Sequence, residues 1–260
     1  MRLTVVGCSG SFPGPDSAAS CYLLEVEDRD RSWRIVVDLG SGSLGPLQRM
    51  IDLSKIDAVV ISHLHPDHFM DLCGLYVARR YHPAGAVAGP LLVYGPEHTA
   101  ARLVQAYGPD AVEELPKVYD VRTLTDGRQV SVGPVTITFR LVQHPVMAYG
   151  MRFEHEGKVI AYSGDTDTCP SLLELARDAD LLLAEASFQE GRDLARGVHL
   201  TGRRAGQVAR DAGAVRLVLT HVPVWTGLDL VVDEARQVFS GPVEAAVPGA
   251  AYVLEDLRVR

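Results

Sequence analysis

The sequence predicts an α/β fold in which two β-sheets pack against each other and helices lie outside them. Short apolar runs of strand type recur along the whole chain, and stretches with helical spacing lie between several of them. No Pro-, Gly- or Ser-rich linker separates the two halves, and no repeat with a fixed period is visible. We therefore expect one domain that spans residues 1–260.

Ten runs rich in β-branched and aliphatic residues predict strands: 3–7, 21–26, 34–38, 57–62, 91–95, 135–142, 158–164, 181–186, 216–221 and 252–259. Four intervening stretches predict helices: 96–107, 170–179, 201–212 and 228–239. The first two begin with Pro, which suits a first helical turn. The third begins with Thr201, a capping residue, and ends before Gly213. The charged run 25–31 predicts a solvated hairpin turn.

The composition excludes several classes of protein. The 260 residues carry a formal net charge of −8, which argues against a surface devoted to nucleic acid. No run approaches the roughly 18 apolar residues of a membrane span, and the first residues lack a signal-peptide pattern. The four cysteines form no C-x-x-C pair and are expected to be reduced. These features predict a cytoplasmic protein that does not associate with membranes.

Ligand-type side chains follow four of the predicted strands. They occur in "DAVVISHLHPDH", "FRLVQH", "VIAYSGD" and "RLVLTH", and the candidates are His63, His65, Asp67, His68, His144, Asp165 and His221. Strand ends in α/β folds gather at one edge, where binding sites are built. We therefore expect these seven side chains to share one site.

The number and type of these residues predict two metal ions. Seven ligands are too many for one tetrahedral ion, whereas two ions that share a carboxylate would use them all. Imidazole and carboxylate suit Zn²⁺, which we expect, and also Mn²⁺ or Fe. Along a strand His63 and His65 would point the same way, and a turn at Pro66 would let Asp67 and His68 address the second ion. Such an ion pair suits in-line displacement at phosphorus.

This order of motifs resembles the metallo-β-lactamase fold superfamily over nearly the whole chain. The resemblance implies a four-layer αββα sandwich. It implies that one ion is held by His63, His65 and His144, the other by Asp67, His68 and His221, with Asp165 bridging. Asp38 in "VVDLGSG" matches an early Asp that is usually structural in this superfamily.

The series "AEASF", "HLTG" and "LTH" resembles the branch of tRNA 3′-processing endonucleases (RNase Z) and related phosphodiesterases. In that branch a Glu and a His at positions matching Glu185 and His199 help to protonate the leaving oxygen. Two departures separate this chain from RNase Z. Ala184 stands where RNase Z has His, and His144 and Asp165 are only 21 residues apart, which leaves room for a hairpin but not for a tRNA-clamping arm.

The segments "GCSGS", "LGPLQRM", "RRYHP" and "PVW" resemble actinobacterial atypical class II cyclic-nucleotide phosphodiesterases more closely. That resemblance implies hydrolysis of 3′,5′-cyclic AMP to AMP by in-line attack of a metal-bound hydroxide. Asp67 would orient the hydroxide, and His199, held by Glu185, would assist the leaving group. The expected partner is a small nucleotide rather than nucleic acid, and related proteins are often homodimers.

Two alternatives remain at this level: a tRNA 3′-processing endoribonuclease, and a metal-stabilised module that binds a nucleotide or a partner without catalysis. A basic surface patch is required by the first. Loss of turnover in a folded Asp67→Ala variant would exclude the second.

Overall fold

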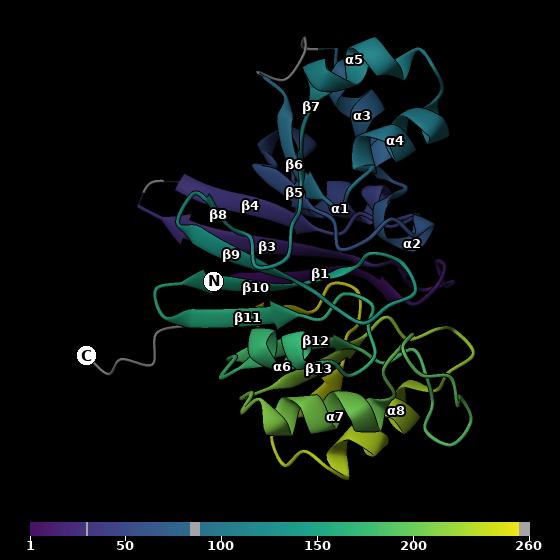
Figure 1. Cartoon of the computed structure of the whole chain (residues 1–260). Coiled ribbons are helices and arrows are strands. Elements are labelled where there is room, and N and C mark those ends of the chain that lie inside the picture. Colours follow the sequence, from purple (N-terminus) through teal and green to yellow (C-terminus); the bar gives the residue numbers. More distant parts are fainter. Residues whose placement is uncertain (30, 84–88, 255–260) are drawn as a thin grey trace.

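A computed structural model describes residues 1–29, 31–83 and 89–254 of the chain. Two sheets pack face to face, and helices cover the outer face of each, so that the described residues form four layers in the order α, β, β, α (Figure 1). The α/β class and the αββα arrangement expected from the sequence are confirmed.

The first sheet has the strand order β15-β1-β3-β4-β5-β6-β7, with β2 beside β1. Its strands are β1 (Arg2–Ser9), β2 (Ala18–Ala19), β3 (Cys21–Asp28), β4 (Arg31–Val37), β5 (Ala58–Val60), β6 (Leu91–Gly95), β7 (Tyr119–Thr123) and β15 (Ala251–Val253). The strands from β4 to β7 run parallel, so their carboxyl ends lie at one edge.

The second sheet has the order β14-β13-β12-β11-β10-β9-β8. Its strands are β8 (Gln129–Val132), β9 (Val135–Leu141), β10 (Tyr149–His155), β11 (Lys158–Tyr162), β12 (Leu181–Glu185), β13 (Leu217–Thr220) and β14 (Val243–Ala245). Strands β8 to β11 form an antiparallel meander, and β11 to β14 run parallel.

The helices divide between the two outer faces. The first sheet is covered by α1 (Leu44–Met50), α2 (Pro66–Phe69), α3 (Leu72–Arg80), α4 (Thr99–Tyr107) and α5 (Ala111–Val118), with a 3-10 turn η1 (Leu53–Lys55). The second is covered by α6 (Pro170–Ala176), α7 (Gly202–Asp211) and α8 (Leu228–Arg236). None of these described helices has both the length and the apolar character needed to cross a bilayer.

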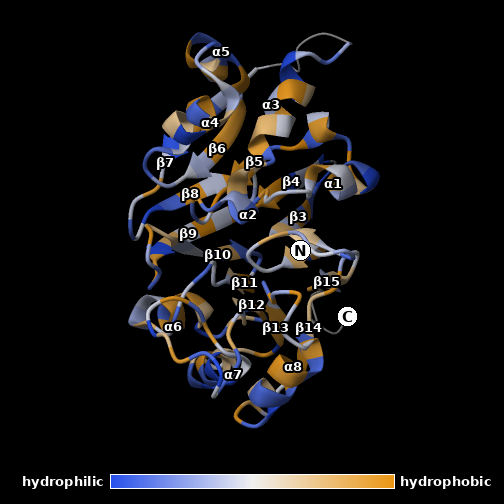
Figure 2. Cartoon of the chain, turned by 90° about the vertical axis from the view of Figure 1, so that its right-hand side faces the viewer, coloured by the Kyte–Doolittle hydropathy of each residue, from blue (hydrophilic) through white to orange (hydrophobic). Residues whose placement is uncertain are grey.

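Hydrophobic side chains fill each gap between layers. One cluster lies between the sheets and includes Tyr22, Phe139 and Phe153, all nearly inaccessible to solvent. Two further clusters join each sheet to its own helices. Figure 2 shows the same division, with orange on the strands and blue on the outer parts of the helices. The close packing of two rigid sheets gives the strand ends a fixed frame.

The predicted strands and the four predicted helices are present, with boundaries that differ by a few residues. The last predicted strand is observed only as β15, and its residues 255–259 lie outside the described part of the chain. One local prediction was wrong. Strand β5 ends at Val60, so His63 and His65 lie in the following loop rather than on a strand, and Pro66 begins helix α2 instead of a turn.

Candidate metal centre

The seven predicted ligands meet where strands end. His63 to His68 follow β5, and the other three follow β9, β11 and β13. Their ligand atoms fall into two groups, within each of which all atoms lie within 4.8 Å of one another. The groups are His63, His65, His144 and Asp165, and Asp67, His68, Asp165 and His221. The structure therefore brings all seven together, with Asp165 in both groups.

In the first group three imidazole nitrogens face one another. Nε2 of His63 lies 2.9 Å from Nδ1 of His65, and Nε2 of His144 lies 3.4 Å from the same atom. Oδ2 of Asp165 lies 3.6 Å from Nε2 of His63. Four ligands held at the usual zinc distances in a tetrahedron lie about 3.3 Å apart, which is the range seen here.

The second group is more deeply buried. Nε2 of His221 lies 3.2 Å from Nε2 of His68 and 3.0 Å from Oδ2 of Asp67. Asp165 completes the group, with its Oδ1 3.3 Å from His68 and its Oδ2 3.5 Å from His221. Asp165 is 2% exposed, and its Oδ1 receives no hydrogen bond from the described residues. A buried carboxylate oxygen without a donor is costly, and a cation between the two groups would compensate it.

The outward nitrogens show that the imidazoles are set up as ligands. In four of the histidines Nδ1 faces an oxygen outside the ligand groups. The Nδ1 of His63 lies 3.1 Å from Oγ of Ser62, and that of His68 lies 2.7 Å from Oδ2 of Asp38. The Nδ1 of His144 lies 2.8 Å from the carbonyl oxygen of Val198, and that of His221 lies 2.6 Å from Oγ of Ser187. Each ring can donate its Nδ1 proton outward and keep the Nε2 lone pair for the group. Burial also lowers the pKa of His63 and His144, which favours the neutral ligand form. The residues fit a pair of divalent ions.

Asp38 supports the metal centre by a hydrogen bond to the outward nitrogen of His68. This carboxylate is fully buried and accepts hydrogen bonds from Nδ1 of His68, from the backbone and side chain of Ser62, and from the hydroxyl of Tyr162. A carboxylate behind a metal-binding imidazole fixes its ring orientation and raises its basicity. The structural role expected for Asp38 is thus an orienting one.

Two glycines allow the backbone to approach the centre closely. A Cβ on Gly40 would lie 1.9 Å from the carbonyl oxygen of Asp67, and a Cβ on Gly10 would lie 2.3 Å from that of His221. Only glycine fits at such a distance. Gly10 belongs to the "GCSGSFPGP" loop, whose backbone packs against the segment that carries His221.

Glu185 and His199 form a pair at the edge of both groups. Nδ1 of His199 donates to Oε1 of Glu185 at 2.7 Å, and its Nε2 has no hydrogen-bond partner among the described residues. The ring centroid of His199 lies 5.3 Å from that of His144 and 5.7 Å from that of His221. Burial lowers the pKa of His199, but the charge of Glu185 and its hydrogen bond outweigh this and raise it to about 9. An imidazolium at this position can donate a proton at neutral pH.

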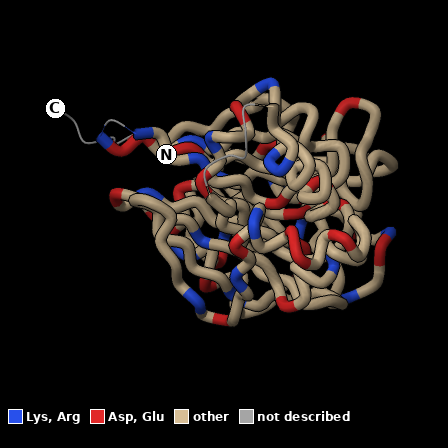
Figure 3. Tube along the Cα trace, turned by 90° about the horizontal axis from the view of Figure 1, so that it is seen from above, with Lys and Arg blue, Asp and Glu red and all other residues tan. Residues whose placement is uncertain are grey.

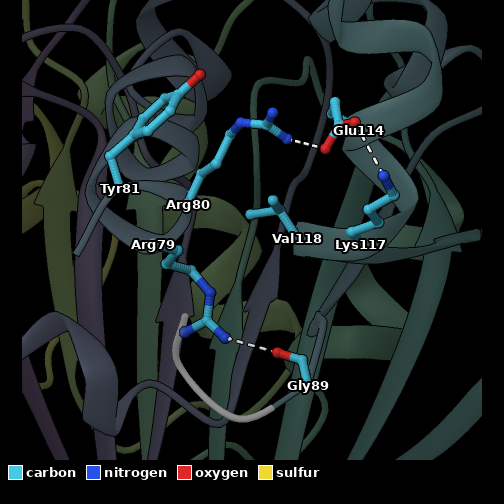
Figure 4. Close-up of a pocket in the computed structure, with 7 residues that line it drawn as sticks. All are labelled: Arg79, Arg80, Tyr81, Gly89, Glu114, Lys117 and Val118. Atoms are coloured by element: carbon cyan, nitrogen blue, oxygen red, sulfur yellow. Dashed lines mark hydrogen bonds and ion pairs between the residues drawn. The ribbon is translucent and has the colours of Figure 1, made fainter. Parts of the chain in front are cut away.

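A separate hollow between α3 and α5 does not belong to this centre. Figure 4 shows Arg80 and Lys117 both turned toward Glu114, while Arg79 turns away from them toward the carbonyl of Gly89. The residues that line this hollow include none of the seven ligands and neither Glu185 nor His199, so the hollow is not part of the candidate active site.

Comparison with known proteins identifies the family. Residues 33–222 match the beta-lactamase superfamily domain, and this span contains all seven ligands. The chain belongs to the beta-lactamase superfamily. Within the superfamily it is 36% identical to the probable metallo-hydrolase YhfI of Bacillus subtilis, over 97% of this chain and 99% of that protein. The crystal structure of YhfI superposes with a TM-score of 0.86 at 31% identity, covering 96% of this chain and 98% of that one.

Three further similar proteins extend the comparison. The Mycobacterium leprae protein ML1173 is 44% identical over 98% of this chain and 89% of its own length. Ribonuclease Z of Bacillus licheniformis is 27% identical over 94% of this chain and 96% of that protein. The short form of human tRNase Z shares the fold, with a TM-score of 0.78 at 22% identity over 98% of this chain and all of that one. The chain is a metallo-hydrolase of the beta-lactamase fold with a His/Asp cluster compatible with two metal ions.

Proposed function

We propose that this metallo-hydrolase is a phosphodiesterase that hydrolyses a small cyclic nucleotide, with 3′,5′-cyclic AMP as substrate and AMP as product. The observation that supports this most directly is the Glu185–His199 pair beside both ligand groups. Cleavage of an alkyl phosphodiester expels an alkoxide that must be protonated, and a positioned imidazolium is suited to this task. Two adjacent ligand groups with a shared carboxylate also suit displacement at phosphorus.

The ligand residues would divide between two ions. His63, His65, His144 and Asp165 would hold one, and Asp67, His68, Asp165 and His221 the other. When bound, two divalent ions polarise phosphoryl oxygens and lower the pKa of a water molecule, and Zn²⁺ is the metal we propose.

Three side chains would orient the attacking water and protonate the leaving oxygen. Asp67 would accept a hydrogen bond from the attacking water and orient it toward phosphorus. Glu185 is fully buried and accepts hydrogen bonds from His199, from the amide of Thr166 and from the amide of Ser187, which fix its position behind His199. His199 would then donate its Nε2 proton to the leaving 3′ oxygen as the P–O bond breaks.

Two features favour a small substrate. The interval between His144 and Asp165 is taken up by the paired strands β10 and β11, which leaves no tRNA-clamping arm there. Lys and Arg are interspersed with Asp and Glu along the chain rather than gathered in one stripe (Figure 3). Nucleic-acid binding would instead require a concentrated basic footprint.

A tRNA 3′-processing endoribonuclease is the second candidate, because ribonuclease Z is among the similar proteins and shares the fold. Both candidates are tested by a substrate screen on the purified protein, whose metal content is measured first. We expect that it releases AMP from 3′,5′-cyclic AMP and does not cleave precursor tRNA. A chain with both sites occupied that releases no AMP would contradict the proposal, and cleavage of precursor tRNA would favour the alternative. A folded Asp67→Ala variant should lose turnover, which distinguishes an enzyme from a binding module.

We also propose a cytoplasmic location and a homodimeric state. Light scattering of the purified protein tests the second directly: a mass near 56 kDa, twice the 28.2 kDa of one chain, is expected. A mass of one chain at micromolar concentration would contradict it.

A further inference from the structure

Asp167 is a buried carboxylate that lies close to the centre but belongs to neither ligand group. It is 3% exposed. Its Oδ1 accepts from Nη1 of Arg204 at 2.5 Å and from the amide of Thr168 at 2.7 Å. Its Oδ2 accepts from the amide of Gly197 at 2.8 Å and lies 3.1 Å from Nε of Arg196. Because both oxygens of this buried carboxylate accept hydrogen bonds, the position of the Asp167 side chain is fixed.

The carboxylate connects the segment that carries His199 to the rest of the protein. Residues 186–201 form no helix or strand, and the backbone pairing beside His199 is an isolated bridge between Phe188 and Thr201, in which the Phe188 amide donates to the Leu200 carbonyl. The segment before His199 therefore depends on side-chain contacts for its position. Gly197 lies two residues before His199 and has φ of +76°. The hydrogen bond from the Gly197 amide to Asp167 therefore constrains the backbone just before His199, the proposed proton donor.

On its other oxygen, Asp167 is bonded to Arg204 in helix α7. Arg204 lies in the first turn of α7, is 5% exposed, and follows the N-cap Thr201, whose hydroxyl accepts from the Arg204 amide. The backbone amide of Asp167 donates to the carbonyl of Gln143 at 2.8 Å, beside the ligand His144. Asp167 thus ties the His199 segment to helix α7 through its side chain and to the ligand segment through its main chain.

We propose that Asp167 is a positioning residue that holds His199 in place for proton donation, acting through the amide of Gly197 and the guanidinium of Arg204. This inference rests on the proposed role of His199 as proton donor. Its specific consequence is that loss of the Asp167 side chain impairs leaving-group protonation, whereas the main-chain bond to Gln143 and the metal ligands remain.

Two substrates with different leaving groups test this. The 3′ oxygen of cyclic AMP needs a proton to leave, whereas p-nitrophenolate from an aryl phosphodiester leaves without one. We expect Asp167→Asn to lower kcat for cyclic AMP by at least about tenfold, within the range of general acid catalysis, with KM little changed. The kcat for bis(p-nitrophenyl) phosphate should change by no more than about twofold. Metal content and the unfolding midpoint are measured on the same preparations.

The matched control is Asp193→Asn. Asp193 lies in the same irregular segment and accepts from the amide of Gln189 and from Arg192, and within the described part of the chain it forms no hydrogen bond or ion pair with Gly197 or α7. This variant should hydrolyse both substrates like the wild type. If Asp167→Asn fails to fold because Arg204 is left unpaired, Asp167→Asn combined with Arg204→Met removes the buried charge and should show the same selective loss.

The outcomes separate the inference from the function on which it rests. His199→Ala is the reference, and it should lose cyclic AMP hydrolysis selectively. If His199→Ala is selective but the Asp167 variants lose both activities equally, or neither, the positioning role is overturned and the proposed function stands. If His199→Ala itself affects both substrates equally, the proton-donor role of His199 is overturned and the inference about Asp167 with it, whereas the proposed function fails only if the metal-loaded wild type releases no AMP.

Discussion

Replacing Glu185 by Gln should remove the charge that keeps His199 protonated. Glu185 accepts from His199 Nδ1 and from the Thr166 amide through the same oxygen, Oε1, and from Ser187 through the other. A Gln that keeps its oxygen at the Oε1 position still accepts the first two hydrogen bonds. The substitution therefore removes one negative charge and one hydrogen bond while the orientation of the His199 ring is kept.

The size of the effect follows from the pKa of His199. Burial alone lowers this pKa, and the charge of Glu185 and its hydrogen bond raise it to about 9. Without the charge, the pKa should return to about its ordinary value of 6.5. At pH 8 the protonated fraction of His199 would then fall from about nine tenths to about 3%, a loss of roughly 30-fold in kcat for cyclic AMP. At pH 6 the loss should be less than about twofold.

A pH–rate profile of kcat for the metal-loaded protein measures this. The alkaline limb should move toward lower pH in Glu185→Gln, because the acid form of His199 is the active one. Glu174→Gln, which alters an exposed carboxylate on α6, is the control and should leave the profile unchanged. An alkaline limb that stays in place in Glu185→Gln would refute the assignment of His199 as proton donor.

Three further predictions concern the metal centre. Gly40→Ala should displace the Asp67 backbone and reduce the bound metal, measured by elemental analysis, because its Cβ would lie 1.9 Å from the Asp67 carbonyl oxygen; two ions per folded chain would contradict this. Asp38→Asn should weaken metal affinity by about 10–100-fold, measured by competition with a chelator, since His68 loses its charged partner; an unchanged affinity would count against the orienting role. Chelation should lower the free energy of unfolding by about 4 kcal/mol for each ion, about 8 kcal/mol for both, relative to protein with ions at 1,000 times their Kd, measured by denaturation; an unchanged stability would argue against bound ions.

The ligand residues could be predicted from sequence because each ligand segment begins within three residues of the end of an apolar run. His221 comes immediately after β13, and Asp165 three residues after β11, so strand recognition alone placed them at sheet edges. The local geometry of His63 and His65 could not be obtained in the same way. Strand β5 is only three residues long, and its end depends on pairing with β4 and β6 rather than on its own residues.

The residues that orient the site could not be predicted from sequence. Ser187 contacts His221 and Asp167 contacts Arg204 across 34 and 37 positions of the chain, and single Ser and Asp residues give no pattern that reveals such contacts. Several elements were missed for related reasons. Helix α5 contains Pro116, and strand β10 contains Gly150, so in both cases tertiary packing overrides a residue that usually interrupts the element.

Crystals of the zinc-loaded chain, measured at the zinc absorption edge, test the central claim most directly. We predict two anomalous peaks per chain, both in contact with Asp165. One should be bound by His63, His65 and His144, and the other by Asp67, His68 and His221. A single peak, or a peak bound by Glu185 and His199 instead, would contradict the account.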